Sequence, residues 1–342
     1  MSGIRRIAAA EVLSWYQDCP LMKTIVVSAA KNGHVNQCLA VCDVAGWRPD
    51  GVVRIPAPGR MTPWPQRVWL KLRRAFATSR ALPDRREGER LRIVASGAAS
   101  ERVVAAYRAL YGRDLFAAFS GRPNWSTPIF DVALVPRHSL SENECPDTFE
   151  VAGARRAILR RGVPVRTSPV PACEGQGVLA MIGGVNKAFD VEPVRIVQQV
   201  DQMLQRGVDG PFLMAFSRRT PGSVEGALRA SLKDKNVDFI DRHDRAGFER
   251  ALYGAARYVV TPDSLTMLCE ACNTGRPTQV FDLHCFDPSS TTARCVQDLV
   301  DGGEVARASQ GTPAASAPGG FVAPAAALDA YEAWRAELAD AP

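Results

Sequence analysis

"YVVTPDSLTMLCEACNTGRPTQVFDL", residues Tyr258–Leu283, is the stretch that decides the fold. An apolar run leads into a proline turn, then into a segment of helical composition that stops at Gly275, and then into a second apolar run. This order predicts a strand, a short buried helix and a strand, the βαβ unit of a parallel sheet. The polar residues Asp263, Ser264 and Glu270 interrupt a segment that otherwise favours burial, so they need an explanation of their own.

Apolar β-rich runs alternate with helical stretches along most of the chain, which predicts parallel sheets covered by helices. The strands expected in the first half are Thr24–Ser28, Gly51–Ile55, Leu91–Ala95 and Phe130–Val135. The strands expected in the second half, besides those of the opening stretch, are Val178–Ile182, Pro211–Phe216 and Val237–Ile240. A terminal helix is expected at Pro324–Leu338, with proline in its first turn.

A connector divides the chain into two α/β halves. Residues 160–177 hold three prolines and three glycines, and residues 306–320 are rich in Ala, Ser, Pro and Gly, which are loop-forming compositions. We therefore expect domains at residues 1–170 and 171–305, followed by a flexible segment and terminal helix at 306–342. The predicted fold class is α/β, with two Rossmann-like doubly wound domains that face each other across a cleft.

Length and composition indicate a globular protein in a reducing compartment. The 342 residues are 46% hydrophobic, and no run approaches the roughly 20 apolar residues of a membrane-spanning helix. The N-terminus lacks the pattern of a signal peptide, so we expect a cytoplasmic protein. Nine cysteines are scattered through apolar sequence, and the CxxC of Cys269 and Cys272 has no second ligand pair. We expect buried thiols there and no metal site.

Much of the net charge of +6 comes from residues 60–92, which carry ten Lys and Arg against three Asp and Glu, interleaved with Trp64, Trp69 and Phe76. A basic helix with aromatic residues on its other side can bind an anionic lipid surface, here the inner face of the cytoplasmic membrane. An ordinary solvated amphipathic helix explains the same pattern. Nucleic acid is not expected as a partner, because no nucleic-acid-binding motif accompanies the charge.

Chemistry is expected in the turns that follow the strands, because helix N-termini there present free backbone N–H groups. The first such turn, "SAAKNGHVNQ", contains His34, and the turn after Phe130–Val135 contains His138. A histidine in such a turn is compatible with a solvated loop residue and with a functional base. Ser96 and Gly97 precede another helix, and for Ser96 we expect helix capping alone.

In the second half, "LAMIGGVNKAFD" places Gly183 and Gly184 directly after an apolar strand, with Lys187 as a further donor. Paired glycines let a ligand or an opposing domain approach the backbone. The segment is not GxGxxG, and no acidic residue follows a second strand at the spacing that a dinucleotide ribose requires. Nicotinamide-dependent chemistry is therefore disfavoured.

The next strand ends in "SRRT", where Ser217, Arg218 and Arg219 precede a helix N-terminus. Two arginines and neighbouring hydroxyls match the fixed cations and hydrogen-bond donors that a phosphate group needs. Because exposed arginines are common, one of the two fits equally well as an ordinary surface residue.

The polar trio of the opening stretch fits the same ligand. Asp263 or Ser264 is expected to cap the helix. Glu270 follows Asp263 by about two helical turns, so both carboxyl groups share one face. Ser264 and the adjoining N–H groups can hold an anion, and Glu270 can accept hydrogen bonds from a ribose diol. Helix caps and a surface salt bridge are the alternative explanation.

Five blocks resemble, in order, those of the mitochondrial fission (elongated mitochondria) family of bacterial and plant proteins: "VVSAAKNGHVNQCLAV", "DVALVPRHSLSENE", "LAMIGGVNKAFD", "FLMAFSRRTPGSV" and "YVVTPDSLTMLCEACNTGRPTQVF". The last block also resembles the donor-site helix of nucleotide-sugar transferases of the GT-B architecture. This resemblance implies an N-terminal acceptor domain, a C-terminal nucleotide-sugar domain and no required metal. It assigns His34 to the acceptor side, and to the donor side it assigns Gly183, Gly184, Ser217, Arg218, Arg219, Ser264 and Glu270.

The sequence therefore predicts a metal-independent glycosyltransferase that moves a sugar from a nucleotide-sugar donor to a glycan or lipid-linked glycan at the cytoplasmic membrane face. Asp263 and Lys187 complete the expected donor site, and the nucleotide sugar is a substrate, so no cofactor is expected. His34 is the expected base for the acceptor hydroxyl, with His138 as the second candidate. A nucleotide-sugar epimerase and a non-catalytic membrane-associated scaffold are the alternatives.

Overall fold

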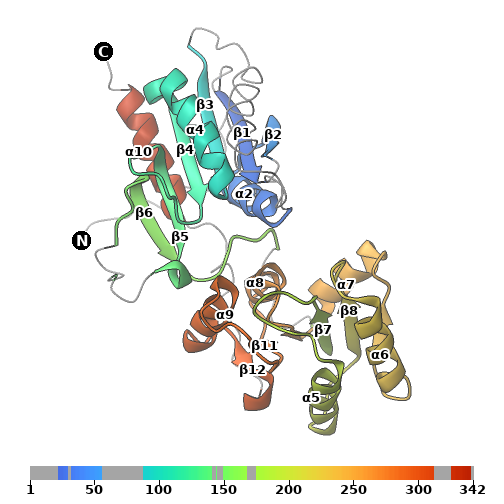
Figure 1. Cartoon of the computed structure of the whole chain (residues 1–342). Helices are drawn as coiled ribbons and strands as arrows, with labels where there is room; N and C mark the ends of the chain where they lie inside the picture. Colours follow the sequence, from blue (N-terminus) through green and yellow to red (C-terminus); the bar gives the residue numbers. More distant parts are fainter. Residues whose placement is uncertain are drawn as a thin grey trace, which may run out of the picture.

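The computed structural model describes residues 22–29, 32–55, 88–140, 144, 149–167, 175–311 and 325–339. These residues build two six-stranded sheets, each made of parallel strands and covered by helices on both faces (Figure 1). The predicted fold class is confirmed, since both halves are Rossmann-like and doubly wound.

The first sheet has the strand order β2-β1-β3-β4-β5-β6. Its strands are β1 (Met22–Ala29), β2 (Gly51–Ile55), β3 (Arg90–Ser96), β4 (Leu115–Ser120), β5 (Phe130–Pro136) and β6 (Ala154–Arg160). Its helical elements are α2 (Asn32–Val44), α4 (Ala98–Tyr111), the short 3-10 turns η1 (Gly112–Asp114) and η2 (Arg137–Ser139), and the C-terminal helix α10 (Ala325–Ala339). The direction in which strands are added reverses between β1 and β3.

The second sheet has the order β12-β11-β10-β7-β8-β9. Its strands are β7 (Val178–Ile182), β8 (Phe212–Phe216), β9 (Asp238–Ile240), β10 (Arg257–Val260), β11 (Thr278–Val280) and β12 (Ala306–Arg307). Its helical elements are α5 (Pro193–Gln205), α6 (Gly222–Leu232), α7 (Arg245–Gly254), α8 (Leu265–Asn273), α9 (Thr291–Asp301) and the 3-10 turn η5 (Ala308–Gln310). Here the direction reverses between β7 and β10.

The central strands are apolar because both faces of each sheet are covered. Every residue of β4 and of β7 is buried, as expected for parallel strands between two helical layers. In the first domain α4 packs on one face, while α2 and α10 pack on the other. In the second domain α5 and α6 cover one face, and α7, α8 and α9 cover the other.

The structure contains β4, β6, α9 and β12, which the sequence pattern did not reveal. β4 follows directly on η1, so no loop signal separates it from the preceding helix. β6 is an edge strand with Arg155 and Arg156 exposed, and it therefore lacks a continuous apolar run. β12 and η5 are ordered pieces within the segment from residue 306 that composition had marked as flexible, because β12 pairs with β11.

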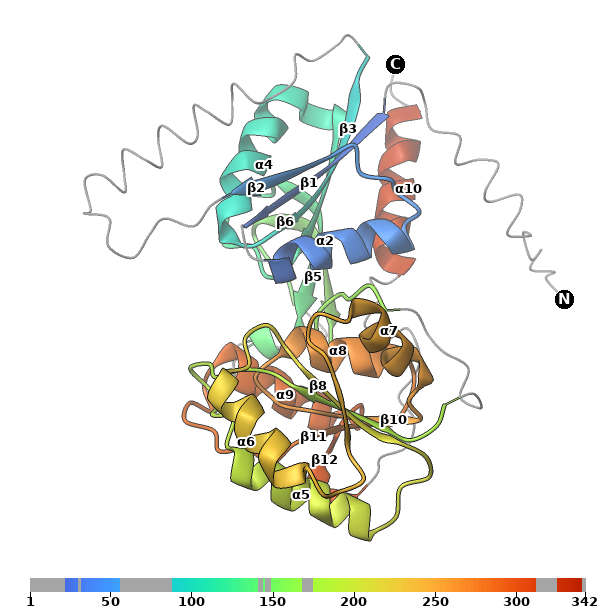
Figure 2. The same ribbon diagram turned by 90° about the vertical axis from the view of Figure 1, so that its right-hand side faces the viewer.

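The predicted terminal helix is present as α10, and it packs on the first sheet although it follows the second domain in the chain (Figures 1 and 2). Tyr331 lies edge-on to Trp47 at a centroid distance of 4.9 Å, and Trp334 lies 5.6 Å from Phe116. The indole N–H of Trp334 donates to the carbonyl oxygen of Arg113 at 3.0 Å. The apolar face of α10 thus completes the core of the first domain.

Replacing Trp334 with alanine is expected to lower the free energy of unfolding by about 3–5 kcal/mol, because a buried indole is removed and a cavity remains. Trp334→Phe keeps most of the apolar volume and loses the hydrogen bond, so it is expected to cost about 1–2 kcal/mol. Urea denaturation followed by circular dichroism measures both. Equal midpoints for wild type and Trp334→Ala would show that α10 contributes nothing to the core.

The basic segment at residues 60–92 lies mostly outside the described residues, which leave out 56–87. Its last cation, Arg92, belongs to β3 and is only 2% exposed. The Arg92 guanidinium lies over the rings of Trp47 and Tyr331, at 5.2 and 5.4 Å from their centroids. Arg92 is therefore a core residue and is not available to a lipid surface. In the described part of the chain, no helix has the length and apolarity needed to cross a bilayer.

Candidate functional site

Each sheet has one place where the direction of strand addition reverses, and we call these the first and second switch points. In open α/β sheets, ligands bind outside the carboxyl ends of the strands at such a point. His34 and Ser96 follow β1 and β3 at the first switch point, and Gly183 and Asp263 follow β7 and β10 at the second. Four residues that the sequence singled out therefore flank the two reversals.

His34 lies in the first turn of α2, which begins at Asn32. Its ring nitrogen Nδ1 lies 3.0 Å from Ser96 Oγ, so the contact bridges the loops after β1 and β3. Ser96 Oγ in turn lies 3.2 Å from Gln37 Oε1 and 2.9 Å from the carbonyl oxygen of Ser120. The expectation that Ser96 only caps α4 is wrong, because its hydroxyl orients the imidazole instead. The ring edge also packs beside Gly97, the N-cap of α4 at φ 86°, where a Cβ would lie 3.6 Å from His34 Nε2.

Asp263 ties the loops of the second switch point together. Its carboxylate accepts hydrogen bonds from Gly184 N at 2.9 Å and Thr261 Oγ1 at 2.7 Å, and it pairs with Arg219 Nη2 at 3.2 Å. Burial of the Asp263 side chain raises its pKa, although these three donors pull it down. The carboxylate is thus a buried structural link between the loops after β7, β8 and β10, rather than a helix cap or an exposed ligand group.

The paired glycines serve this link. Gly183 N donates to Thr261 Oγ1 at 2.7 Å, and Gly184 N donates to Asp263, so both amides are already engaged. A Cβ on Gly183 would lie 2.1 Å from Asp263 Oδ1, and one on Gly184 would lie 2.3 Å from the carbonyl oxygen of Arg219. The groups that approach the backbone of these glycines therefore belong to neighbouring loops of the same domain. The two amide N–H groups bond to those loops and are not available to a ligand.

The Gly184→Ala variant is expected to lose about 1–3 kcal/mol of stability, because the new methyl group collides with backbone that cannot move aside. Gly226 in α6 is the matched control, since a Cβ there meets no atom within 4 Å. Gly226→Ala is expected to be neutral or to stabilise by about 0.5–1 kcal/mol through helix propensity. Thermal unfolding of the two variants checks this, and equal midpoints would refute the packing role of Gly184.

The N-terminus of α8, at the second switch point, has no side-chain cap. Ser264 occupies the N-cap position, but its side chain accepts no hydrogen bond from the first turn, so the capping role predicted for Asp263 or Ser264 is wrong. The first-turn N–H groups of a helix have no intrahelical acceptor. They carry the positive end of the helix dipole and suit an anionic group.

Arg219 pairs with Asp263, the residue before the N-cap of α8, and Arg218 is its neighbour in the loop after β8; both arginines are exposed. Arg219 is held by Asp263, whereas no described residue pairs with the guanidinium of Arg218. The Ser217 hydroxyl makes hydrogen bonds within its own turn: its Oγ contacts Thr220 Oγ1 at 3.1 Å and accepts a hydrogen bond from Arg219 N at 3.1 Å. Lys187 is exposed in the loop after β7. The two arginines can therefore meet an anion at α8, while Ser217 mainly shapes the loop.

Glu270 lies on α8, where its side chain is partly buried. No described residue donates a hydrogen bond to its carboxylate, and burial raises its pKa to about 7. Its carbonyl oxygen accepts from Thr167 Oγ1 at 3.0 Å, so this part of α8 packs against the segment that leaves the first domain. A partly desolvated carboxylate without a protein partner is a strong acceptor for ligand hydroxyls.

Glu270 is expected to contribute stability at pH 5 that is lost as the pH rises to 8, because the folded residue holds its proton up to pH about 7 whereas the unfolded residue loses it near 4.3. Glu270→Gln removes this contribution. Urea denaturation at pH 5 and pH 8 is expected to show that wild type loses about 2–3 kcal/mol more than Glu270→Gln over this interval. The exposed Glu249 provides the control variant Glu249→Gln. Identical pH dependence in wild type and Glu270→Gln would rule out the raised pKa.

The two switch points face each other. A Cβ built on Gly33, beside His34, would lie 3.8 Å from Thr266 Oγ1 in the first turn of α8. Figure 2 shows α2 and α8 on the facing sides of the two domains. A further contact is made by η2, which packs against α9. The loop that carries His34 and the N-terminus of α8 are therefore brought together across the domain boundary.

His138 is placed elsewhere. It lies in η2 after β5, it is 7% exposed, and its Nδ1 is buried without a hydrogen-bond partner among the described residues. Burial, followed by the nearby Arg294 and Arg160, lowers the pKa of His138 to about 4. The structure therefore brings His34 to a switch point and leaves His138 in the contact between domains.

The buried thiols of the CxxC do not form a reactive pair. Burial raises the pKa of Cys269 to about 11, and Val163 N donates to its sulfur at 3.3 Å. The pKa of Cys272 is also raised by burial. No cluster of three or more His, Cys, Asp or Glu side chains that could hold a metal ion is found within the described ranges.

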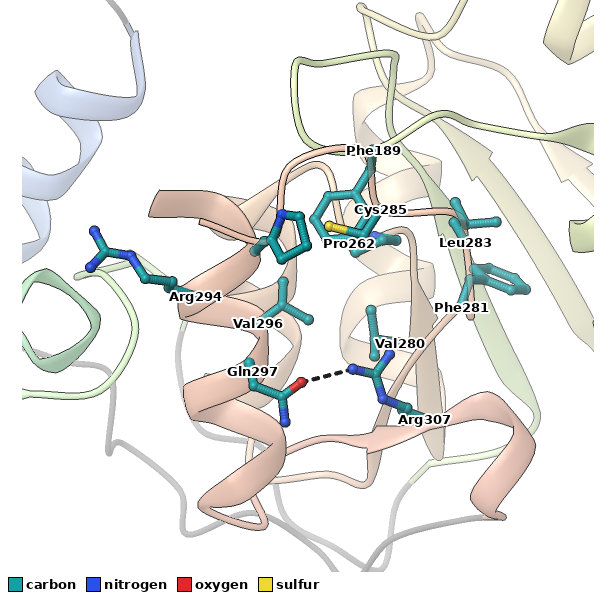
Figure 3. A pocket seen from close by; sticks show the side chains of 12 residues that line it. Phe189, Pro262, Val280, Phe281, Leu283, Cys285, Arg294, Val296, Gln297 and Arg307 are labelled. Carbon is teal, nitrogen blue, oxygen red and sulfur yellow. Dashed lines mark hydrogen bonds between the residues drawn. The ribbon is translucent and has the colours of Figure 1, made fainter. Parts of the chain in front are cut away.

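A cavity of about 290 Å³ lies behind the turn that leads into α8 (Figure 3). Phe189, Pro262 and Phe281 are among its apolar walls, and Gln297 and Arg307, joined by a 2.9 Å hydrogen bond, lie on its polar side. None of the residues predicted to bind the donor lines this cavity. Pro262 in its wall directly precedes Asp263, so the cavity adjoins the second switch point without including the residues predicted there.

The chain has remote similarity to several solved structures. No curated protein is detectably similar to the chain. Among solved structures, MurG of Acinetobacter baumannii has 13% identity and a TM-score of 0.46, covering 85% of this chain and 87% of that one. UDP-GlcNAc 2-epimerase of Neisseria meningitidis, bound to UDP-GlcNAc, has 9% identity and a TM-score of 0.49, covering 92% and 100%. Heptosyltransferase WaaC of E. coli, with ADP, has 13% identity and a TM-score of 0.42, covering 92% and 99%.

Likenesses at this level concern the fold alone, and what those proteins bind is a property of those proteins. The family comparison reaches further. The model described as "Mitochondrial fission ELM1" matches residues 32–328, which is most of the chain and includes both switch points. The chain belongs to the mitochondrial fission ELM1 family.

Proposed function

We propose that this protein is a glycosyltransferase that takes a sugar from a nucleoside-diphosphate donor and needs no metal ion. One observation carries the proposal: the second switch point combines an uncapped helix N-terminus, two exposed arginines and, on the same helix, the carboxylate of Glu270, which no described residue pairs with. A nucleoside diphosphate has an anionic part for the first two features and a ribose diol for the third.

The donor phosphates would lie against the first turn of α8, with Arg218 and Arg219 on the side of β8. As the bond between sugar and phosphate breaks, negative charge grows on the leaving phosphate. Fixed N–H dipoles and guanidinium groups stabilise this charge without reorganisation, which is the task that a divalent cation performs in other enzymes. Asp263 holds Arg219 in place for this role.

The ribose would donate its hydroxyl hydrogens to Glu270. The carboxylate accepts both only when ionised, and burial raises its pKa to about 7. Donor affinity is therefore expected to rise with pH through this region. Gly183, Gly184 and Ser217 contribute by fixing the loops, and Lys187 is an additional cation near the phosphates.

The acceptor would approach from the first domain, with His34 taking the proton of its hydroxyl. We propose a glycan, free or lipid-linked, as the acceptor class and the inner face of the cytoplasmic membrane as the place of action. The basic and aromatic composition of residues 60–92 supports the membrane part of this proposal.

A thermal-shift screen over UDP, GDP, ADP, TDP and CMP sugars tests the function. A ligand at 100 times its dissociation constant adds about 2.7 kcal/mol of stability, which gives a clear rise in melting temperature. A rise with one sugar nucleotide, followed by transfer to a glycan acceptor, supports the transferase. Turnover of the sugar nucleotide with no acceptor would identify an epimerase instead. If no sugar nucleotide raised the melting temperature, the non-catalytic scaffold would be the remaining explanation.

A further inference from the structure

His138 is a buried titratable group in the contact between the two domains. It lies in η2, directly after β5, and η2 packs against α9 of the second domain. Figures 1 and 2 both place the carboxyl end of β5 beside α9. The imidazole is 7% exposed, and its Nδ1 is buried without a hydrogen-bond partner among the described residues. A buried polar nitrogen that makes no hydrogen bond weakens the contact that buries it.

The charged groups that act on this imidazole are cations from both domains. Arg294 belongs to α9, and its side chain points away from the cavity on the other side of that helix (Figure 3). Arg160 ends β6 in the first domain and is 7% exposed. Both guanidinium groups oppose a positive charge on His138.

The carboxylates around the η2–α9 contact are engaged with other cations. Arg161 Nη1 pairs with Glu304 at 2.7 Å, and Arg161 Nε lies 3.9 Å from Asp298 on α9. Arg137, the neighbour of His138 in η2, also acts on Asp298. Among the described residues, no carboxylate offsets the two cations that act on His138. The remaining titratable and charged groups near η2 and Arg160 are the ion pair of Arg122 with Glu144 and the buried thiols of Cys269 and Cys295.

We infer that His138 makes the contact between the domains sensitive to pH: the neutral imidazole allows η2 to pack on α9, and its protonation favours their separation. A charged imidazolium in this place would be desolvated and would lie close to two guanidinium groups. After separation the same group is hydrated, and salt screens its neighbours. The inference concerns the domain arrangement and does not depend on the proposed function.

The direction of the effect follows from the linkage between protonation and packing. Burial, followed by Arg294 and Arg160, lowers the pKa of His138 in the packed contact to about 4, whereas an exposed imidazole titrates near 6.5. The stability that neutral His138 allows is therefore fully present above pH about 6.5 and is lost as the pH falls towards 4. Between pH 8 and pH 5, the ratio of separated to packed contact is expected to rise about 30-fold.

Hydrogen exchange measures this equilibrium without any ligand. Amide protection is determined at pH 8 and pH 5 in peptides that cover η2 and α9, and it is corrected for the intrinsic pH dependence of exchange. Wild type is expected to lose about 30-fold more protection there than His138→Phe, which has no titrating group at this position. Peptides of α5, which covers the opposite face of the second sheet, provide the internal reference. His243→Phe is the matched control, because His243 is exposed in the second domain.

A second pair of variants tests the cation on α9. Arg294→Gln removes one of the two guanidinium groups that act on His138, so its pH-dependent loss of protection is expected to be smaller than in wild type. Arg294→Lys keeps the positive charge and is expected to behave like wild type. Titration by nuclear magnetic resonance, with His138→Phe to assign the signal, is expected to give a His138 pKa of about 4 in wild type and a higher pKa in Arg294→Gln.

Two results would overturn the inference. One is an equal loss of protection in wild type and His138→Phe between pH 8 and pH 5. The other is a wild-type His138 that titrates like an exposed imidazole, near 6.5. Should His138→Phe fail to fold, the comparison of Arg294→Gln with Arg294→Lys still decides. No sugar nucleotide or acceptor enters these measurements, so their outcome is separate from that of the proposed transferase.

Discussion

Replacing Arg218 and Arg219 together with alanine is expected to lower kcat by about 10²–10³-fold, the loss typical when positioned donors to a developing negative charge are removed. Both guanidinium groups are exposed in the loop after β8, and Arg219 is paired with Asp263 next to the N-terminus of α8. Because the charge on the leaving phosphate is greater in the transition state than in the bound donor, kcat is expected to suffer more than donor affinity. Initial rates at saturating donor measure the effect.

The two arginines are expected to differ when they are replaced singly. Arg219 pairs with the buried Asp263 at 3.2 Å, so Arg219→Ala is expected to lower the melting temperature as well as the rate. Arg218→Ala is expected to leave the melting temperature unchanged. Arg245, which is exposed on α7 and pairs only with Glu249 among the ion pairs of the described residues, provides the control. Full turnover in the double variant would contradict the assignment of the leaving-group site.

His34→Ala is expected to abolish transfer, with a loss of about 10²–10⁴-fold, while nucleotide binding stays intact. The physical reason is that His34 lies at the first switch point and the donor site at the second, so the variant removes the base without touching the donor contacts. Transfer assays and calorimetric titration of the nucleotide, made on the same preparation, separate the two effects.

The other histidines serve as controls. His243→Ala is expected to be fully active, because this residue is exposed in the second domain and is not among the residues assigned to either switch point. His138→Ala is expected to change stability and leave kcat unaltered, because His138 is buried against α9. If His34→Ala were active and His138→Ala inactive, His138, which lies in the contact between the domains, would be the base instead.

The sequence located several residues of the two switch points because strand ends are local signals. Apolar runs followed by glycine, arginine or serine mark the carboxyl ends of strands, and these ends gather at one edge of a parallel sheet. His34, Arg218 and Ser264 were located in this way. Alternation of strands and helices also indicated two doubly wound halves, which the structure confirms.

Contacts that depend on strand order could not be read from local pattern. Asp263 bonds to Gly184, 79 residues away, and to Arg219, 44 residues away, because β7 lies between β10 and β8. Ser96 meets His34 across 62 residues for the same reason. From the sequence, a polar residue before a helix reads as a cap, and only the order of the strands shows that Asp263 and Ser96 have partners in neighbouring loops.

The return of α10 to the first domain was equally hidden. Its aromatic residues Tyr331 and Trp334 indicate a buried face, but nothing in their spacing tells which sheet they cover. The partners Trp47 and Phe116 belong to the first domain, and the whole second domain lies between them and α10 in the chain. Long-range packing of this kind follows from the shape of the finished domain and has no local sequence signal.

Calorimetric titration of UDP, GDP, ADP, TDP and CDP, with pyrophosphate as the probe that lacks a ribose, tests the second switch point as the nucleotide site most directly. One nucleoside diphosphate is expected to bind wild type and to bind Glu270→Ala about 10- to 100-fold more weakly, the cost of losing hydrogen bonds to a charged group. Pyrophosphate is expected to bind both proteins equally and to be lost in Arg218→Ala/Arg219→Ala. Undiminished nucleotide affinity in Glu270→Ala, or the absence of binding to wild type, would contradict the account.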